Sequence, residues 1–157
     1  MSDVHVRVMT NSDLPRVGEL AGALVRLHHQ WDPKRFFLVD GVEDGYRRWF
    51  SSQLRRDGVV LLVAEVQGAV AGYVYGSLEE RDWNQLLDAH GALHDVFVDA
   101  AFRRRGVAKA LLLAAIDALE GQGAPRVVLS TSTKNVEAQA LFRSLGFRDT
   151  MIELTRG

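Results

Sequence analysis

The spacing of apolar and polar residues predicts most of the secondary structure in the first part of the chain. Residues 4–8 alternate between apolar and polar side chains, which is the period of a half-buried strand. Residues 14–28 place apolar side chains at helical spacing on one face, and Ser12 before them is a suitable N-cap. Asp40 and Glu43 have the spacing of a capping box, which predicts a second helix directly after them.

The rest of the chain is predicted to alternate between strands and helices. Residues 59–66 and 69–77 are rich in β-forming side chains, and Gln67-Gly68 between them predicts a hairpin turn. The elements expected further on are, in chain order, a strand at 93–98, a helix at 107–120, a strand at 126–130, a helix at 135–145 closed by Gly146, and a last strand at 147–155.

The order β-α-α-β-β-β-α-β-α-β sets the expected fold class. A hairpin-rich first half followed by β-α-β-α-β connections predicts an α/β protein with a mixed sheet, because helical crossovers join parallel strands. The pattern contains no internal repeat and no linker, and 157 residues is a usual size for one domain. Residues 1–157 are therefore expected to form a single domain.

Composition narrows the functional classes. A formal net charge of −1 argues against a general nucleic-acid binder, which would carry an excess of basic residues. The chain has no cysteine, which excludes disulfides, cysteine-based metal sites and an acyl-cysteine intermediate, and no metal site is expected. Neither a signal peptide nor a run of about 20 apolar residues is present, so the expected location is the cytoplasm, away from a membrane.

A basic run lies between the strand at 93–98 and the apolar helix at 107–120. Its sequence is Arg103-Arg104-Arg105-Gly106-Val107-Ala108. A glycine allows a ligand to approach the backbone closely, and the start of a helix presents unpaired N–H groups. Such a turn by itself is as often a solvated basic loop. The helix behind it is apolar on nearly every side and therefore buried, which favours a positioned phosphate site.

A second motif follows at residues 135–147, and with it the chain resembles the GNAT superfamily of N-acetyltransferases. That family has Gln/Arg-x-x-Gly-x-Gly/Ala at the start of a helix and later Asn-x-x-Ala-x-x-Leu-Tyr-x-x-x-Gly-Phe. The first pattern is matched by Arg103, Gly106 and Ala108, and the second by Asn135, Ala138, Leu141, Gly146 and Phe147. The resemblance implies a GNAT fold, with a central mixed sheet of six to seven strands flanked by about four helices.

The resemblance also implies where the cofactor acetyl-coenzyme A (acetyl-CoA) binds. Backbone N–H groups from Arg104 to Ala108 would hold the pyrophosphate, and the backbone of residues 96–98 would pair with the pantetheine arm, with an amide near Val96 facing the thioester oxygen. Asn135 would hydrogen-bond the pantetheine region, cap its own helix, or do both. The implied cofactor-binding residues are Val96, Phe97, Val98, Arg103, Arg104, Arg105, Gly106, Val107, Ala108, Lys109, Asn135 and Phe142.

Acyl transfer to an amine also needs a group that removes a proton from the ammonium. The segment His94-Asp95-Val96-Phe97-Val98 is similar to Glu-Asp-Phe-Phe-Val in the spermidine/spermine acetyltransferase branch, and His94 lies where that branch has its catalytic glutamate. An imidazole titrates near neutral pH, so His94 is the first candidate for the base, the alternative being a structural histidine. Asp95 is the second candidate, because it points to the opposite face of a regular strand unless a bulge rotates it.

The chain departs from the family pattern at the general acid. Many relatives have a tyrosine that protonates the departing thiolate, and this chain has Phe142 at that position. CoA thiolate is a tolerable leaving group at neutral pH, so this loss need not abolish activity, and Tyr73, Tyr75 or a water molecule could supply the proton instead. The departure also favours an alternative function, a catalytically weak sensor or scaffold that binds acyl-CoA.

The acceptor is expected between the connection after the first helix and the loop at 79–91. Carboxylates beside aromatic side chains suit a cationic amine, although exposed loop carboxylates with aromatic rings packed on the core are the more ordinary explanation. We expect a small polyamine-like or amino-sugar amine, with a protein or peptide amine as the alternative. There is little room for further strands after the last one, so an open sheet edge could be covered by a second subunit in a homodimer, the alternative being a monomer with six or seven strands. The candidate substrate-binding residues are Trp31, Asp32, Phe36, Glu79 and Asp82.

Overall fold

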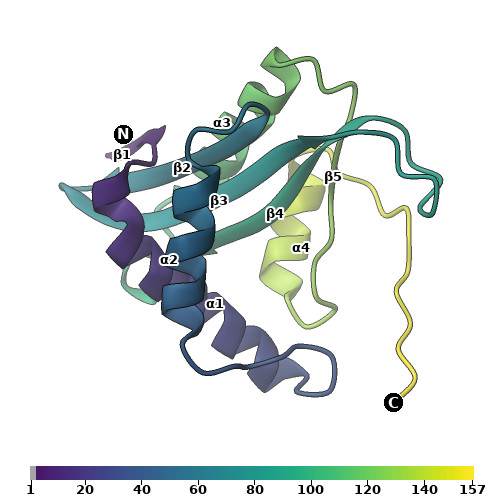
Figure 1. The fold of residues 1–157 in the computed structure, drawn as a ribbon, viewed down its shortest axis with the longest axis horizontal. Coiled ribbons are helices and arrows are strands. Elements are labelled where there is room, and N and C mark those ends of the chain that lie inside the picture. The colour runs from purple at the N-terminus through teal and green to yellow at the C-terminus, as the bar shows by residue number, and fades with distance from the viewer. Residues whose placement is uncertain (1–2) are drawn as a thin grey trace.

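The computed structural model describes residues 3–157, and its elements follow the expected order up to the last helix (Figure 1). None of the helices in this range is long and apolar enough to cross a membrane. The elements are β1 (Val4–Val8), the 3-10 helix η1 (Asn11–Asp13), α1 (Leu14–Trp31), α2 (Val42–Gln53), β2 (Val59–Val66), β3 (Ala69–Glu79), β4 (His90–Val98), the 3-10 helix η2 (Ala100–Phe102), α3 (Val107–Gly121), β5 (Val127–Leu129) and α4 (Val136–Ser144).

Within residues 3–157 the strands form one five-stranded sheet in the order β1-β2-β3-β4-β5. The first four strands are joined antiparallel, whereas β4 and β5 are parallel, so the sheet is mixed as expected. The expected hairpin between β2 and β3 turns at Gln67 and Gly68, whose left-handed φ values of 52° and 77° are those of a type I′ turn.

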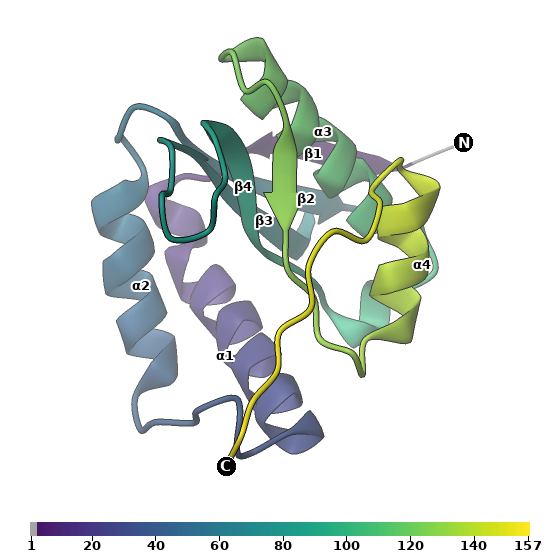
Figure 2. The same cartoon turned by 90° about the vertical axis from the view of Figure 1, so that its right-hand side faces the viewer.

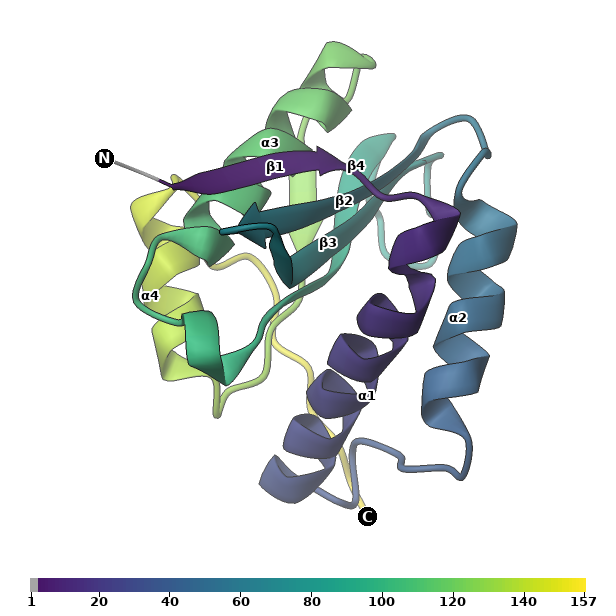
Figure 3. The ribbon, with the colours of Figure 1, turned by 90° about the vertical axis from the view of Figure 1, so that its left-hand side faces the viewer.

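Different helices cover the two faces of the sheet (Figure 3). On one face Leu20 of α1 and Phe50 of α2 pack with Tyr73 of β3. On the other face Leu111 of α3 packs with Val74, the next residue of the same strand. Neighbouring residues of a strand point to opposite faces, so β3 contributes to both cores, which explains its nearly continuous apolar sequence.

The expected last strand at 147–155 is not formed, and the expectation of six to seven strands is therefore wrong for residues 3–157, which contain five. After α4 the chain leaves the sheet and runs in extended form toward the end of α1 (Figures 1 and 2). There Glu153 accepts a hydrogen bond from Arg35 at 2.9 Å. Met151, Ile152 and Leu154 remain 76%, 82% and 89% exposed, so these three side chains do not pack into the core.

The starts of the first two helices also differ from expectation. No capping box forms at residues 40–43, because Gly41, with a left-handed φ of 71°, is the N-cap of α2. Glu43 instead pairs with Arg26 of α1 at 2.5 Å, which joins the two helices. Ser12 lies inside η1 and does not cap α1.

Candidate active site

A β-bulge in β4 brings His94 and Asp95 to the same face of the sheet. The register between β3 and β4 shifts by one residue after Tyr75, which is paired with Asp95, so His94 is an extra residue in β4. The ring of His94 lies 4.8 Å from that of Tyr75, and Asp95 accepts a hydrogen bond from Tyr73. Both tyrosines belong to the face covered by α1 and α2. This face therefore carries both of the expected catalytic side chains.

His94 is anchored by two residues of β3. Its Nε2 lies 2.7 Å from Oγ of Ser77, and that hydroxyl donates to Oε1 of Glu79 at 2.6 Å. The same carboxylate oxygen lies 3.8 Å from Nε2. Ser77 is buried, whereas the side chain of His94 is 38% exposed. The imidazole is thus fixed by a hydrogen bond to Ser77 and partly exposed to solvent, which suits a group that exchanges protons with a ligand.

Asp95 lies deeper in the same face. Its Oδ2 accepts a hydrogen bond from the hydroxyl of Tyr73 at 3.1 Å. Burial raises the pKa of Asp95, and the bond from Tyr73 partly opposes this effect. Burial also raises the pKa of Tyr73 well above its ordinary value and that of Tyr46 to about 12. An uncompensated negative charge is therefore costly in this cluster, and a cation beside Asp95 would stabilise its ionised form.

The edge of β4 is open where β5 diverges from it. β5 pairs with residues 91–93 of β4, and from His94 onward the only strand of residues 3–157 that pairs with β4 is β3. A cavity of about 220 Å³ lies where the two strands separate. The backbone of residues 96–98 follows along the free edge, where an extended ligand arm adds in the manner of a strand. The cavity lining includes His90, Ala92 and His94 of β4 and Leu129 and Ser130 at β5.

The basic turn before α3 has the geometry of an anion site. Arg104 and Gly106 both have a left-handed backbone, with φ values of 64° and 77°, and α3 begins at Val107. Left-handed residues in such a turn aim successive N–H groups at one point. Within residues 3–157 the backbone N–H groups of residues 104–109 have no protein acceptor. They can therefore bind a pyrophosphate at the start of the helix.

The three arginine side chains of the turn have different surroundings. The guanidinium of Arg103 lies 5.6 Å from the ring centre of Phe97, and that of Arg105 lies 5.7 Å from the ring centre of Phe102. Arg104 is exposed, and its side chain has no hydrogen bond or ion pair within the described part of the chain. Arg103 and Arg105 therefore brace the turn, and Arg104 is the guanidinium best placed to meet a phosphate.

Sequence reasoning missed the residues that hold this turn in place. Asp99, directly after β4, accepts a hydrogen bond from the N–H of Ala101 at 3.0 Å through Oδ1. Its Oδ2 forms an ion pair with Arg16 of α1. The N–H bond and Arg16 hold the pKa of Asp99 below its usual range. The ion pair thus joins the turn to a helix from the other layer, a contact that the position of Asp99 in the sequence does not reveal.

The motif on α4 is partly a structural feature. Asn135 is the N-cap of α4, as expected, since its Oδ1 accepts the N–H of Ala138 at 3.3 Å. Its amide NH₂ group is left to donate elsewhere. Phe142 is buried in the core, with its ring centre 6.1 Å from that of Phe147. The contacts of Asn135 and Phe142 with a cofactor stay predictions.

The residues expected at the acceptor site divide into separate groups. Trp31 and Phe36 lie together at the end of α1, with ring centres 4.9 and 5.0 Å from that of His28. The carboxylates of Asp32 and Asp82 each accept N–H bonds from their own turns. Glu79 is bound to the serine beside the catalytic histidine candidate. Figures 1 and 2 show the β3–β4 connection, which carries Asp82, away from the end of α1.

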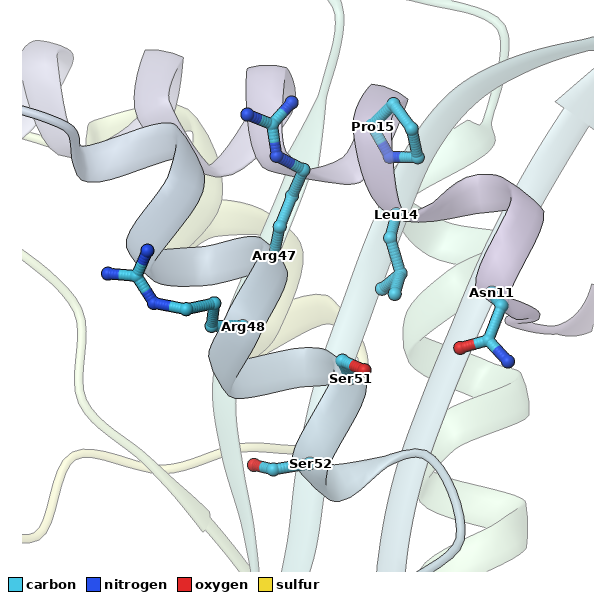
Figure 4. A pocket seen from close by; sticks show the side chains of 7 residues that line it. All are labelled: Asn11, Leu14, Pro15, Arg47, Arg48, Ser51 and Ser52. Atoms are coloured by element: carbon cyan, nitrogen blue, oxygen red, sulfur yellow. The ribbon is translucent and has the colours of Figure 1, made fainter.

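A second hollow lies on the outer side of the helical layer, between the start of α1 and the end of α2 (Figure 4). One of its arginines, Arg47, pairs with Asp44 of its own helix. The hollow contains neither the residues around His94 nor the turn before α3, so the two catalytic candidates are not part of it. Its lining residues are Asn11, Leu14, Pro15, Arg47, Arg48, Ser51 and Ser52.

A family model described as the acetyltransferase (GNAT) family matches residues 23–147, a span that includes the bulge, the basic turn and α4. The chain belongs to the GNAT family. A curated relative of this GNAT protein, N-acetyltransferase 8 of Homo sapiens, is 37% identical over 99 residues, which are 63% of this chain and 43% of that protein. The matched part of the chain spans 43% to 46% of the length of N-acetyltransferase 8 and of two other curated relatives.

Another relative matches the GNAT chain over more of its length. It is the [ribosomal protein bS18]-alanine N-acetyltransferase of Salmonella typhimurium, which is 28% identical over 148 residues, covering 94% of this chain and 82% of its own. The similarity of β4 to the spermidine/spermine branch stays a prediction.

Solved structures of two N-acetyltransferases have the same fold. An aminoglycoside N-acetyltransferase in complex with CoA superposes with a TM-score of 0.76 at 23% identity, covering 100% of this chain and 95% of that one. Glucosamine-6-phosphate N-acetyltransferase from Arabidopsis thaliana has a TM-score of 0.71 at 22% identity, covering 98% and 97%. At these identities the likeness concerns the fold, and the acceptors are those of the other proteins.

Proposed function

We propose that this GNAT chain transfers an acetyl group from acetyl-CoA directly to a primary amine of a small molecule, with both substrates bound at once. The observation that carries this proposal is the position of His94. It lies at the bulge of β4, on the face that also carries Asp95, and beside the point where β4 and β5 separate. The same strand leads to the anion site before α3. A proton acceptor inside a rigid strand, with a phosphate site just after the end of that strand, suits acyl transfer from CoA.

The residues of the site fit acetyl-CoA in their chemistry. The N–H groups of residues 104–109 suit the pyrophosphate, and the Arg104 guanidinium adds a positive charge. The free edge of β4 at residues 96–98 suits the pantetheine amides, and the NH₂ group of Asn135 is a further donor. When bound, acetyl-CoA supplies the thioester, whose C–S bond breaks as the C–N bond to the amine forms, so that CoA leaves as the thiolate.

His94 takes the proton of the acceptor ammonium in this proposal. An ammonium has no lone pair, so the attacking amine must first become neutral. Since Nε2 of His94 faces Ser77, Nδ1 is the ring nitrogen left to accept this proton, which it passes to solvent. The amine loses a second proton to solvent as the amide forms. The absence of cysteine supports direct attack, because the commonest covalent acyl carrier is missing.

Asp95 attracts the ammonium group of the acceptor. Burial raises the pKa of this carboxyl, and a neighbouring cation lowers it again, so amine binding and ionisation of Asp95 favour each other. His28 is close enough to interact electrostatically with Asp95, and it joins Trp31 and Phe36 in an aromatic group. Aromatic faces near a partly buried carboxylate suit a cationic amine of small size.

Two kinds of similar protein bear on the acceptor, and they favour different classes. The structures that share the fold include an aminoglycoside N-acetyltransferase and glucosamine-6-phosphate N-acetyltransferase, whose named acceptors carry amines on sugars. The alternative acceptor is the amine of a protein or peptide. It is favoured by the relative from Salmonella typhimurium, which is named for an alanine of a ribosomal protein and matches 94% of this chain.

A second candidate function is an acyl-CoA-binding sensor or scaffold with little catalysis. Phe142 favours it, because a buried phenyl ring has no proton to give to a thiolate. Tyr73 is a poor replacement, since its hydroxyl is buried and bonded to Asp95. Tyr75, which is partly exposed beside His94, and water remain as proton donors.

Release of free CoA thiol in the presence of an amine panel separates these functions. The panel contains a linear polyamine, an aminoglycoside, glucosamine 6-phosphate and a peptide that begins with alanine. We expect turnover with at least one of the small amines, and faster turnover than with the peptide. The reverse order would favour the peptide acceptor. Tight binding of acetyl-CoA by calorimetry, with no thiol release from any mixture, would favour the sensor.

We also infer that a second copy of the chain covers the outer side of β5, the last strand of the sheet. β5 has three residues, and the tail after α4 exposes Met151, Ile152 and Leu154. Unpaired strand edges and exposed apolar side chains are features that association removes. Size-exclusion chromatography with light scattering should give the mass of a dimer, and a monomer at all concentrations would contradict the inference.

A further inference from the structure

The hydroxyl of Ser77 and the carboxylate of Glu79 form a hydrogen-bonded chain that ends on His94. Ser77 lies in β3 beside the bulge of β4, and Glu79 is the last residue of β3. We propose that Ser77 and Glu79 are positioning residues, which hold His94 in the form with hydrogen on Nε2 and leave Nδ1 as the free base. The use of that base rests on the proposed function, whereas the state of the ring does not.

The direction of the chain follows from counting protons. A serine hydroxyl has one hydrogen, and the 2.6 Å bond from Ser77 to Oε1 of Glu79 uses it, since a carboxylate can only accept. Oγ of Ser77 can then only accept at its second contact, the 2.7 Å distance to Nε2 of His94. Nε2 must therefore carry a hydrogen. In a neutral imidazole the other nitrogen, Nδ1, then has the lone pair.

The ring is held on two sides, so this chain also sets its orientation. Ser77 is 7% exposed and fixed in the ladder between β2 and β4, where it pairs with Val59 and Ala92. The ring of Tyr75 lies 4.8 Å from the imidazole at an angle of 34° between planes. With Nε2 anchored and one ring face covered, rotation that would exchange the two nitrogens is opposed.

Glu79 has a second effect once His94 has taken a proton. Its Oε1 lies 3.8 Å from Nε2, so a positive imidazolium would form next to a carboxylate. Ser77, which lies between the two groups, also favours the protonated ring. The carboxylate of Glu79 polarises the Ser77 hydroxyl, and this makes Oγ a better acceptor for the hydrogen on Nε2. We expected Glu79 to bind the acceptor amine. Its contact with Ser77 supports a role through the histidine instead.

The test combines nuclear magnetic resonance with kinetics on the full chain. Histidine labelled with ¹⁵N reports which ring nitrogen carries hydrogen, and the His94 signals are assigned by their loss in His94→Gln. We expect the Nε2–H form in the unmodified protein. In Glu79→Gln the amide oxygen is a weaker acceptor than the carboxylate, and the amide NH₂ group can donate to Oγ of Ser77 instead. The hydroxyl of Ser77 can then donate to Nε2 in part of the molecules, so a share of the Nδ1–H form should appear. In Ser77→Ala the Nε2–H proton should exchange faster with water.

The kinetic part compares these variants with a matched control. We expect Glu79→Gln and Ser77→Ala to lower kcat about tenfold with the KM for acetyl-CoA unchanged. This is the effect of losing one hydrogen bond to His94 that becomes stronger as the imidazole gains positive charge in the transition state. Glu80→Gln removes the neighbouring exposed carboxylate and should change neither the ring signals nor kcat. Glu79 is exposed, so its variant should fold even where Ser77→Ala does not.

Three results would overturn the inference. They are an Nδ1–H ring in the unmodified protein, ring signals in Glu79→Gln identical to those of the unmodified protein, or an unchanged kcat in Glu79→Gln. Failure of the proposed function has a different signature. In that case His94→Gln turns over normally, or no amine is acetylated, while the ring signals still respond to Glu79→Gln.

Discussion

The glycine in the basic turn offers the sharpest test of the anion site. Gly106 has a φ of 77°, and a Cβ built on it meets no atom within 4 Å. Substitution by alanine therefore creates no steric clash, and only the backbone conformation is penalised. A non-glycine residue in the left-handed region costs about 1–2 kcal/mol. Unfolding entropy of about 2.1 cal/mol/K per residue over 157 residues converts this cost to a Tm lower by roughly 3–6 °C.

The same substitution should weaken acetyl-CoA binding if the turn relaxes to relieve its strain. Relaxation would move the N–H groups of residues 104–109 away from their common point. The loss of one hydrogen bond to a charged group, about 1.5–3 kcal/mol, lowers affinity roughly 10- to 100-fold. Calorimetric titration of Gly106→Ala with acetyl-CoA and a thermal melt measure both effects.

Gly45→Ala is a matched control for this prediction. Gly45 lies inside α2, away from the left-handed region, and a Cβ there also meets nothing within 4 Å. Alanine should raise stability by about 0.5–1 kcal/mol at this helical position and leave acetyl-CoA binding unchanged. The reasoning is refuted if Gly106→Ala melts and binds like the unmodified protein, or if Gly45→Ala loses as much affinity.

Three further substitutions test other parts of the site. Burial raises the pKa of Asp95, so its carboxyl group binds a proton more tightly in the folded protein than in the unfolded chain. The stability that this proton contributes to the folded state is fully present below about pH 4 and is lost as the pH rises through the pKa of the folded state. Urea unfolding should therefore show the stability of the unmodified protein falling relative to Asp95→Asn as pH rises, and a constant difference would contradict this. Phe142→Tyr places a hydroxyl in the core, which should cost about 1–3 kcal/mol in a thermal melt without raising kcat; a higher kcat would show that the hydroxyl reaches the thiolate. Arg16→Gln removes the partner of Asp99, so the turn loosens and the Kd for acetyl-CoA should rise severalfold, most clearly at low salt; an unchanged Kd would mean that the ion pair does not position the turn.

Much of the fold could be predicted because single residues determine local backbone geometry. Gln67-Gly68 specifies a tight hairpin, Gly146 adopts the left-handed backbone expected at the end of a helix, and Asn135 caps α4. The apolar sequence of α3 correctly indicated a buried helix. These features depend on neighbours within a few residues, which the sequence displays directly.

The bulge in β4 and the contacts of Ser77 could not be predicted in the same way. Apolar periodicity does not show a one-residue insertion, because the shift is defined by the register with β3, a partner distant in sequence. Ser77 looked like an ordinary polar residue at the end of an apolar run, and its role depends on that same register. The strand expected at 147–155 has strand-like composition, but a strand forms only where another strand is beside it, and the tail lies elsewhere.

The measurement that tests the account most directly is the rate of CoA release by His94→Gln, at saturating acetyl-CoA and with the best amine of the panel. A general base contributes about 10²- to 10⁴-fold, so kcat should fall by this range while the Kd for acetyl-CoA changes less than about twofold. Turnover by His94→Gln within about threefold of the unmodified protein would contradict the account, because it would show that the histidine at the bulge in β4 is not the general base.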